Sequence, residues 1–254
     1  QHPDHSSASS VPTSGAWHQP VLVEEVVRFL APQAGQIVAD CTMGTGGHSL
    51  ALVPHLLPGG RLIGLDRDAQ ALARARGRLI EFQPVIETVQ DNFCALPAVL
   101  QRLGVPAVHG LVADLGVSSL QLDQPQRGFS FSKEGPLDMR MDARQSTTAA
   151  TLIGQWSERD LAFVLDAYGE ERFARRIAQR IVAARAVSPI QTTAQLARVV
   201  ADAVPRRPGR LHPATRTFMA LRIAVNEELE SLKALLAVLP SVLASGARAA
   251  IITF

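Results

Sequence analysis

A glycine-rich turn directly after a short apolar run places the strongest limit on what this chain can fold into. The apolar run is Ile37–Ala39, Asp40 follows it, and the turn is Gly44-Thr45-Gly46-Gly47. Glycine has no Cβ and tolerates positive φ, so such a turn brings main-chain N–H groups close to a bound ligand. A helix expected near 47–56 would point its unpaired N-terminal amides at the same place. The segment is therefore predicted to begin a βαβ ligand-binding unit.

An acidic residue follows this turn at an informative distance. A second apolar run, 62–65, ends in Asp66, about twenty residues after the turn. A carboxylate at this position accepts hydrogen bonds from ribose hydroxyls in nucleotide-binding βαβ units. The glycines alone are weak evidence, because many tight turns use glycine. The acid at this distance favours a nucleotide-type cofactor.

Two neighbouring residues bear on which cofactor is bound. Ser49 stands where the NAD fingerprint has a third glycine, and Asp40 would lie close to a pyrophosphate. S-adenosylmethionine has a ribose, an adenine and a cationic ammonium but no phosphate, so it fits both residues. We predict S-adenosylmethionine as the cofactor. An NAD-dependent oxidoreductase is the alternative that the βαβ unit by itself leaves open.

Composition narrows the class of protein. The chain has 254 residues and 47% hydrophobic content, enough to bury the core of one domain with an insert. Residues 1–16 are rich in Ser and Pro and are predicted to be disordered. No apolar run approaches the roughly 18 residues that span a membrane, and no signal-peptide pattern is present, so a soluble cytoplasmic protein is expected. Cys41 and Cys94 have no metal-ligand spacing, so no metal is predicted.

The positive charge is unevenly distributed. Net charge is only +2, yet the segment from Arg172 to Arg222 contains eleven Arg and a single acid, Asp202. A codon bias toward arginine explains Arg in place of Lys, but it does not explain the missing acids. We interpret the segment as a polyanion-binding surface in preference to an ordinary solvated face.

Strand and helix patterns alternate through the first half of the chain, which predicts an α/β fold with a mostly parallel sheet. Strands are expected near 36–41, 61–66, 84–89, 109–114 and 248–254. Helices are expected near 20–30, 47–56, 68–80, 94–103 and 214–238, the last stopped by Pro240. The alternation lapses after Asp114, where a long loop leads into an Arg-faced helical insert at 143–212. The α/β domain then comprises 17–142 and 213–254.

Several longer motifs follow the fourth expected strand. They are Asp114-Leu115-Gly116-Val117-Ser118-Ser119, Gln121-Leu122-Asp123, Arg127-Gly128-Phe129-Ser130, Gly135-Pro136-Leu137-Asp138-Met139-Arg140-Met141-Asp142, Tyr168-Gly169-Glu170-Glu171 and His212-Pro213-Ala214-Thr215-Arg216-Thr217-Phe218. With these motifs in this order, the chain resembles the RsmH (MraW) family of ribosomal RNA small-subunit methyltransferases from about His18 to Phe254.

The resemblance implies a class I, Rossmann-like S-adenosylmethionine-dependent methyltransferase with an inserted α-helical domain. It implies methylation of the exocyclic N4 amine of a cytidine in small-subunit (16S) ribosomal RNA. The expected partner is this RNA within the small ribosomal subunit, with no membrane and no metal involved. The cofactor contacts that the resemblance implies are Gly46, Gly47, His48, Asp66, Phe93, Asp114 and Gln121.

Roles in catalysis and RNA binding are hypotheses at this point. Asp114 is the candidate catalytic residue at the cofactor crevice, and the alternative that it only holds the cofactor stays open. Phe129 and Phe131 are candidates for stacking on RNA bases, with anchoring of the loop to the core as the alternative. Candidate phosphate contacts are Arg172, Arg175, Arg176, Arg180, Arg206, Arg207 and Arg210.

The end of the printed sequence differs from the family pattern. Members of the family continue past the fifth strand with a His-Ser-Leu-Glu-Asp-Arg type segment and a closing strand pair, whereas the printed sequence ends at Phe254. We expect the sequence to be part of a longer chain; a complete chain would put activity in doubt. A non-catalytic RNA-binding or assembly factor is therefore the second alternative. The cationic insert disfavours a small-molecule methyltransferase.

Overall fold

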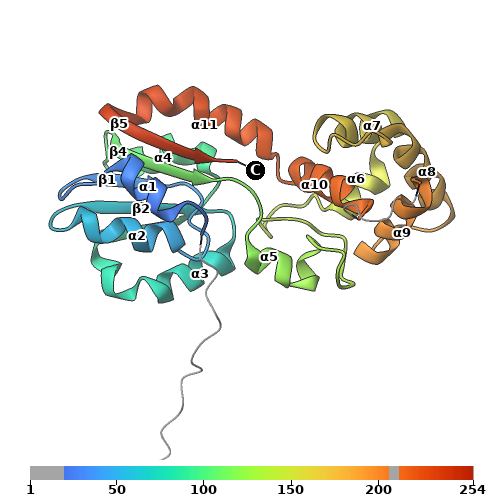
Figure 1. Cartoon of the computed structure of the whole chain (residues 1–254), viewed down its shortest axis with the longest axis horizontal. Coiled ribbons are helices and arrows are strands. Elements are labelled where there is room, and N and C mark those ends of the chain that lie inside the picture. Colours follow the sequence, from blue (N-terminus) through green and yellow to red (C-terminus); the bar gives the residue numbers. More distant parts are fainter. Residues whose placement is uncertain (1–19, 206–211, 254) are drawn as a thin grey trace, which may run out of the picture.

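The computed structural model describes residues 20–205 and 212–253 (Figure 1). The segment 1–16 that we expect to be disordered lies outside the described residues, as do Arg206, Arg207 and Arg210. The described chain forms an α/β unit and a helical unit that lie side by side, with a long connecting segment between them (Figure 1).

A parallel sheet forms the centre of the α/β unit. Its strands are β1 (Ile37–Asp40), β2 (Arg61–Asp66), β3 (Ile86–Gln90), β4 (Val108–Asp114) and β5 (Leu243–Ile252). All neighbours pair in parallel, in the order β3-β2-β1-β4-β5. The expected α/β fold with a parallel sheet is confirmed. The strand order reverses between β1 and β4, and ligands bind at such points beside the carboxyl ends of the strands.

Helices cover both faces of this sheet. On one face lie α1 (Val23–Leu30), α2 (Gly47–Leu56) and α3 (Ala69–Arg78), whose apolar residues share a core with β1 and β2. On the other lie α4 (Leu96–Arg102) and α11 (Glu228–Val242), with the short η2 (Phe93–Ala95) beside them. Because both faces are covered, the strands are near-continuous apolar runs: Leu62, Ile63 and Leu65 of β2 are fully buried.

The helical unit has a core of its own. It contains α6 (Ala149–Gln155), α7 (Glu158–Ala167), α8 (Ala174–Val187), α9 (Thr193–Ala203) and α10 (Ala214–Val225). Side-chain caps begin three of these helices: Ser157 Oγ accepts from the Asp160 amide at 3.1 Å, and Thr148 and Thr192 form capping boxes with Thr151 and Gln195. The connecting segment carries α5 (Ser119–Asp123) and η3 (Pro125–Arg127), and its Leu137 and Met139 pack into the helical core.

The single helix that we expect over 214–238 is instead two helices, α10 and α11. The chain breaks at Asn226 and Glu227, where Glu227 adopts a left-handed φ of 49°. The side chain of Asn226 is fully buried and bonds to the connecting segment, so tertiary hydrogen bonds replace helix continuation. Pro240 lies inside α11 and does not end it. We expect α10 in the α/β domain, yet it packs in the core of the helical unit.

Within the described ranges, no helix combines the length and apolarity that crossing a bilayer requires.

Candidate functional site

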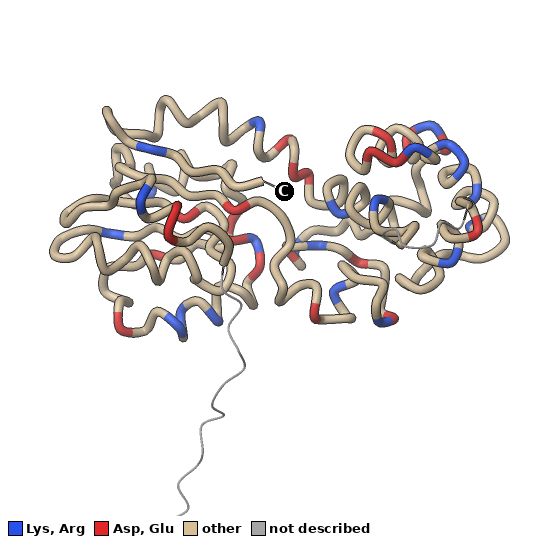
Figure 2. Tube along the Cα trace, in the orientation of Figure 1, with Lys and Arg blue, Asp and Glu red and all other residues tan. Residues whose placement is uncertain are grey.

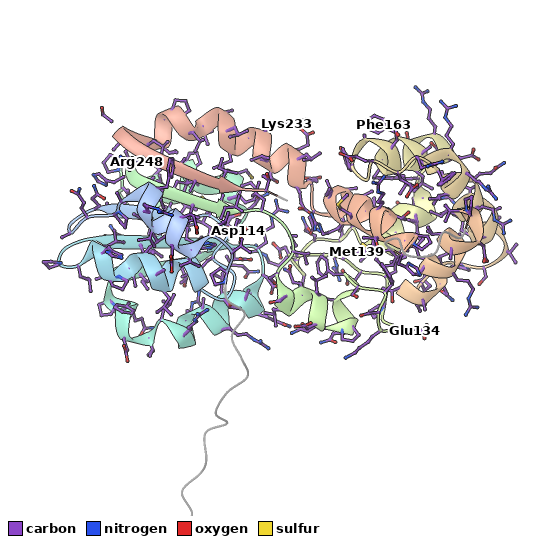
Figure 3. The ribbon with its side chains drawn as sticks, in the orientation of Figure 1. Asp114, Glu134, Met139, Phe163, Lys233 and Arg248 are labelled. Atoms are coloured by element: carbon purple, nitrogen blue, oxygen red, sulfur yellow. The ribbon has the colours of Figure 1, made fainter. Side chains whose placement is uncertain are left out.

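Aspartates end three neighbouring strands at the edge where the strand order reverses. Asp40 ends β1, Asp66 ends β2 and Asp114 ends β4. The charge of Asp114 helps to raise the pKa of Asp40, and the charge of Asp40 helps to raise the pKa of Asp66, so the three side chains lie close together. Figure 3 shows Asp114 at the end of β4, on the side of the connecting segment. The three strand ends therefore lie next to one another, and we call the region beside them the crevice.

Asp66 ties the glycine turn to the second strand. Its Oδ2 accepts a hydrogen bond from the Gly44 amide at 2.6 Å, and its Oδ1 accepts one from the Asp68 amide at 2.8 Å. Burial raises the pKa of Asp66 to about 6, and these two backbone bonds partly oppose that rise. Each carboxylate oxygen can accept a second hydrogen bond, so the group retains capacity for ribose hydroxyls.

Asp40 is buried behind the turn and is held by Ser49. Ser49 Oγ donates to Asp40 Oδ2 at 2.6 Å, and the Thr42 amide donates to Oδ1 at 3.2 Å. Burial raises the pKa of Asp40, and the Ser49 bond is the largest opposing effect. A hydroxyl is therefore needed at position 49 in this chain, which explains why the glycine of the NAD fingerprint is absent.

The glycines of the turn serve close packing as well as conformation. A Cβ on Gly46, where φ is +81°, would lie 2.9 Å from Leu79 Cδ1, and one on Gly47 would lie 2.6 Å from Pro20 Cγ. On Gly44, where φ is +52°, the nearest atom would be 3.9 Å away, so the turn is open there. Only glycine fits positions 46 and 47 without displacing neighbouring atoms.

His48 contributes to the crevice through its backbone. Its ring is buried, Nε2 lies 3.0 Å from the Val21 carbonyl oxygen, and the imidazole lies close enough to Asp40 to oppose part of the rise in the pKa of that carboxyl. The backbone amide of His48 lies in the first turn of α2, where amides have no partner within the helix. A side-chain role for His48 in proton transfer is not supported by this geometry.

Gln121 reaches the junction of β2 and α3 from the connecting segment. Its Nε2 donates to Asp68 Oδ2 at 3.1 Å, and its Oε1 accepts from the Ser118 amide at 3.1 Å, completing a capping box. Asp68 caps α3 through its other oxygen and also accepts from Arg127 Nη1 at 2.7 Å. Gln121 therefore contacts Asp68, which lies two residues after Asp66 in the sequence.

Phe93 lies at the start of η2, beside a buried polar cluster. Its ring is 9% exposed, and the Arg67 guanidinium lies 5.6 Å from the ring centroid. Arg67 also donates to the backbone oxygen of Asn226 and to Ser231 Oγ. Sequence reasoning missed Arg67, Asp68 and Asn226. The one available signal was Asp68 at the N-cap position before a helical pattern.

Asp114 is joined to the glycine turn through its backbone. Its amide donates to Thr42 Oγ1 at 2.6 Å, so the end of β4 is fixed relative to the segment after β1. The side chain is half-buried at the strand end. This position suits both open roles of Asp114, contact with the cofactor and contact with the amine.

The structure favours the anchoring alternative for Phe129 and Phe131. Phe129 is 7% exposed within the helical core, and Arg127 lies over its ring at 5.8 Å. Phe131 packs against the same core, with its ring centroid 4.8 Å from that of Phe218. Both rings therefore anchor the connecting segment. Because apolar neighbours cover Phe129, it cannot stack on an RNA base in this conformation.

The expected arginines are exposed where the structure describes them. Arg172, Arg175, Arg176 and Arg180 face solvent on or just before α8, while Ile177 and Ile181 are buried. Basic positions lie along the outer part of the helical unit (Figure 2). Other arginines of the segment are engaged within the protein: Arg222 pairs with Glu228 at 2.8 Å, and Arg185 donates to the Ile153 carbonyl oxygen.

The donor set of the crevice fits S-adenosylmethionine better than a dinucleotide. Three converging carboxylates favour a ligand that carries a cationic sulfonium and ammonium, and they would repel a pyrophosphate. Among the residues that the structure describes, no cluster of three or more His, Cys, Asp or Glu side chains could hold a metal ion.

Comparison with known proteins agrees with this chemistry. Residues 15–254 match the model of the MraW methylase family. Ribosomal RNA small subunit methyltransferase H of Anaeromyxobacter sp. (strain K) is 51% identical over 239 residues, which cover 93% of this chain and 76% of that protein. The protein of the same name from Desulfosudis oleivorans is 47% identical over 240 residues, covering 93% of this chain and 77% of that one. With the glycine turn, the strand-end carboxylates and this match over nearly its whole length, the chain belongs to the MraW methylase family.

Proposed function

We propose that this methyltransferase transfers a methyl group from S-adenosylmethionine to the N4 amine of a cytidine in small-subunit ribosomal RNA. The observation that carries the proposal is the convergence of Asp40, Asp66 and Asp114 around the glycine turn of a methylase-family chain. The acceptor is proposed because the relatives are named as methyltransferases of small-subunit ribosomal RNA. The fold is the Rossmann-like one that the resemblance implies.

The cofactor-holding residues are proposed from the crevice. S-adenosylmethionine supplies an electrophilic methyl group on a sulfonium. Asp66 accepts the ribose hydroxyls. The amides of Gly47 and His48 in the first turn of α2 line the turn side. They lie beside the backbone of Gly46, whose own amide donates to the Met43 carbonyl oxygen at 2.7 Å. Phe93 and Gln121 close the crevice from η2 and α5. Burial around these groups limits water at the reacting atoms.

Asp114 is the proposed hydrogen-bond acceptor for the reacting amine. The cytosine amine is a poor nucleophile because its lone pair is delocalised into the ring. An acceptor beside it favours a more pyramidal nitrogen and takes up the proton. Alignment of nucleophile, methyl and sulfur supplies much of the remaining rate enhancement, since the reaction is an in-line displacement. The alternative that Asp114 only holds the cofactor remains open.

RNA binding is proposed for the exposed face of the helical unit. Arg172, Arg175, Arg176 and Arg180 present guanidinium groups at helical spacing, which suits contacts to successive phosphates. Such contacts position the RNA without reading its sequence. Arg206, Arg207 and Arg210 stay candidates from the sequence alone. The target base has to be unstacked to reach the crevice, as in other RNA-modifying enzymes.

Transfer of a labelled methyl group tests the proposal. Small ribosomal subunits and naked small-subunit RNA, both from cells that lack this protein, are incubated with the enzyme and labelled S-adenosylmethionine, then digested to nucleosides. Label in N4-methylcytidine is expected. Tight RNA binding without any transfer would favour the assembly-factor alternative. With Asp114→Asn, lost transfer at unchanged cofactor affinity supports the catalytic role, and an equal loss of affinity supports the holding role.

A further inference from the structure

An aromatic series runs from the core of the helical unit to its surface. Phe218 of α10 is 4% exposed, and Phe131 meets it edge-on, with an interplanar angle of 71°. His212 also packs against Phe131. The centroids of these two rings are 4.6 Å apart, and their interplanar angle is 34°. Phe131 is half-buried and His212 is exposed. The outermost ring is therefore an imidazole backed by a fixed phenyl ring.

The ring of His212 is held in place from two sides. Its Nδ1 accepts a hydrogen bond from the Ala214 amide at 3.2 Å, at the start of α10. This bond orients the ring relative to the start of α10. Phe131 supports the ring, and the connecting segment that carries Phe131 is itself anchored by buried Phe129. An exposed aromatic ring that is already ordered loses little entropy when a planar ligand stacks on it.

We propose that His212, backed by Phe131, is a stacking platform for an unpaired base of the substrate RNA. The inference rests on the proposed RNA substrate. Exposed Lys133, two residues after Phe131, and exposed Arg216, one turn along α10, place cations near the platform for the adjoining phosphates; Arg216 Nη1 also donates to the Glu170 carbonyl oxygen. Stacking on an RNA base, first expected of Phe129 and Phe131, is thus assigned to His212, which lies outside them.

The platform takes a base that flanks the target nucleotide. His212 precedes α10, whose 12 residues span about 18 Å, and the other end of α10 adjoins the α/β unit (Figure 1). The crevice formed by Asp40, Asp66 and Asp114 belongs to that unit. A base on His212 therefore holds the strand in position, while a different nucleotide enters the crevice.

Two substitutions separate stacking from helix capping. His212→Asn keeps an acceptor for the amide two residues on, as in an Asx turn, but removes the ring. His212→Phe keeps a ring and removes the acceptor. The probe is a single-stranded RNA oligonucleotide with 2-aminopurine at one position at a time, because the fluorescence of this base is quenched by stacking. Affinity, quenching, methyl transfer and melting temperature are measured for each variant.

Stacking predicts that His212→Asn binds about tenfold more weakly and loses the quenching at one probe position, while its melting temperature and the salt dependence of binding stay close to wild type. His212→Phe retains the quenching. Wild-type affinity and quenching in His212→Asn would overturn this inference but not the proposed function. A His212→Phe protein that loses both affinity and quenching would do the same. Absence of RNA binding and transfer in the wild-type protein would overturn the proposed function as well.

Discussion

Arg127 donates a hydrogen bond from Nη1 to Oδ2 of Asp68 at 2.7 Å, and both side chains are largely buried, at 13% and 3% exposure. The other terminal nitrogen of Arg127 donates to the backbone oxygens of Arg140 and Met141 at 3.0 and 3.1 Å. Asp68 Oδ2 also accepts a hydrogen bond from Gln121 Nε2 at 3.1 Å. This pair therefore holds the connecting segment against the β2–α3 junction, two residues from Asp66.

Removing the Arg127 side chain tests how much this pair stabilises the fold. Arg127→Met leaves the buried Asp68 carboxylate without its ionic partner, so we expect the free energy of unfolding to fall by about 3 kcal/mol. The control is Arg144→Met, since Arg144 pairs with Asp142 at the same 2.7 Å but is 59% exposed. That change should cost less than about 1 kcal/mol. Urea unfolding of both variants measures the difference, and equal effects would contradict this role.

Ser49→Ala tests the bond that holds buried Asp40. Ser49 is fully buried, and its loss removes the strongest hydrogen bond to the ionised carboxylate. Stability should fall by about 1 to 3 kcal/mol. The loss should be larger at pH 8 than at pH 5, because the deprotonated form of Asp40 depends more on the donor. Thermal unfolding at the two pH values checks this, and a loss independent of pH would count against it.

Cofactor affinity should depend on the protonation of Asp66. Folding raises the pKa of Asp66 from 3.8 to about 6, so this group favours the folded state below pH 3.8, and that contribution is lost as pH rises through 6. Accepting both ribose hydroxyls requires the deprotonated form of Asp66, so affinity should rise as pH increases through about 6, with proton release on binding. Calorimetry in buffers of different ionisation enthalpy measures the release. Asp66→Asn should abolish this pH dependence; a wild-type affinity unchanged between pH 5 and 7 would refute it.

Gly46→Ala and Gly77→Ala should have opposite effects. A Cβ at Gly46 meets Leu79 and strains a φ of +81°, so stability should fall by more than about 1 kcal/mol. Gly77 lies in α3 with nothing within 4 Å of a new Cβ, so alanine there should stabilise by up to about 1 kcal/mol. Denaturant midpoints compare the two proteins, and a neutral Gly46→Ala would argue against tight packing of the turn.

The parts of the fold that were predictable from sequence are those set by neighbours along the chain. The turn at Gly44 to Gly47 and the strand ending in Asp66 are local patterns, and each lies where it is expected. The capping box of Thr192 with Gln195 is local in the same sense. The break at Asn226 was not predictable, because hydrogen bonds to Met139 and Met141, more than eighty residues away, cause it. The burial of Phe129 depends on tertiary packing in the same way.

The central claim is most directly tested by mapping modified nucleotides in small-subunit ribosomal RNA from cells with and without this protein. Mass spectrometry of nuclease fragments locates each N4-methylated cytidine. We predict one cytidine that carries the N4 methyl group only when the protein is present and that regains it when the wild-type chain, but not Asp66→Asn, is restored. Identical methylation of the RNA in both strains would contradict the account.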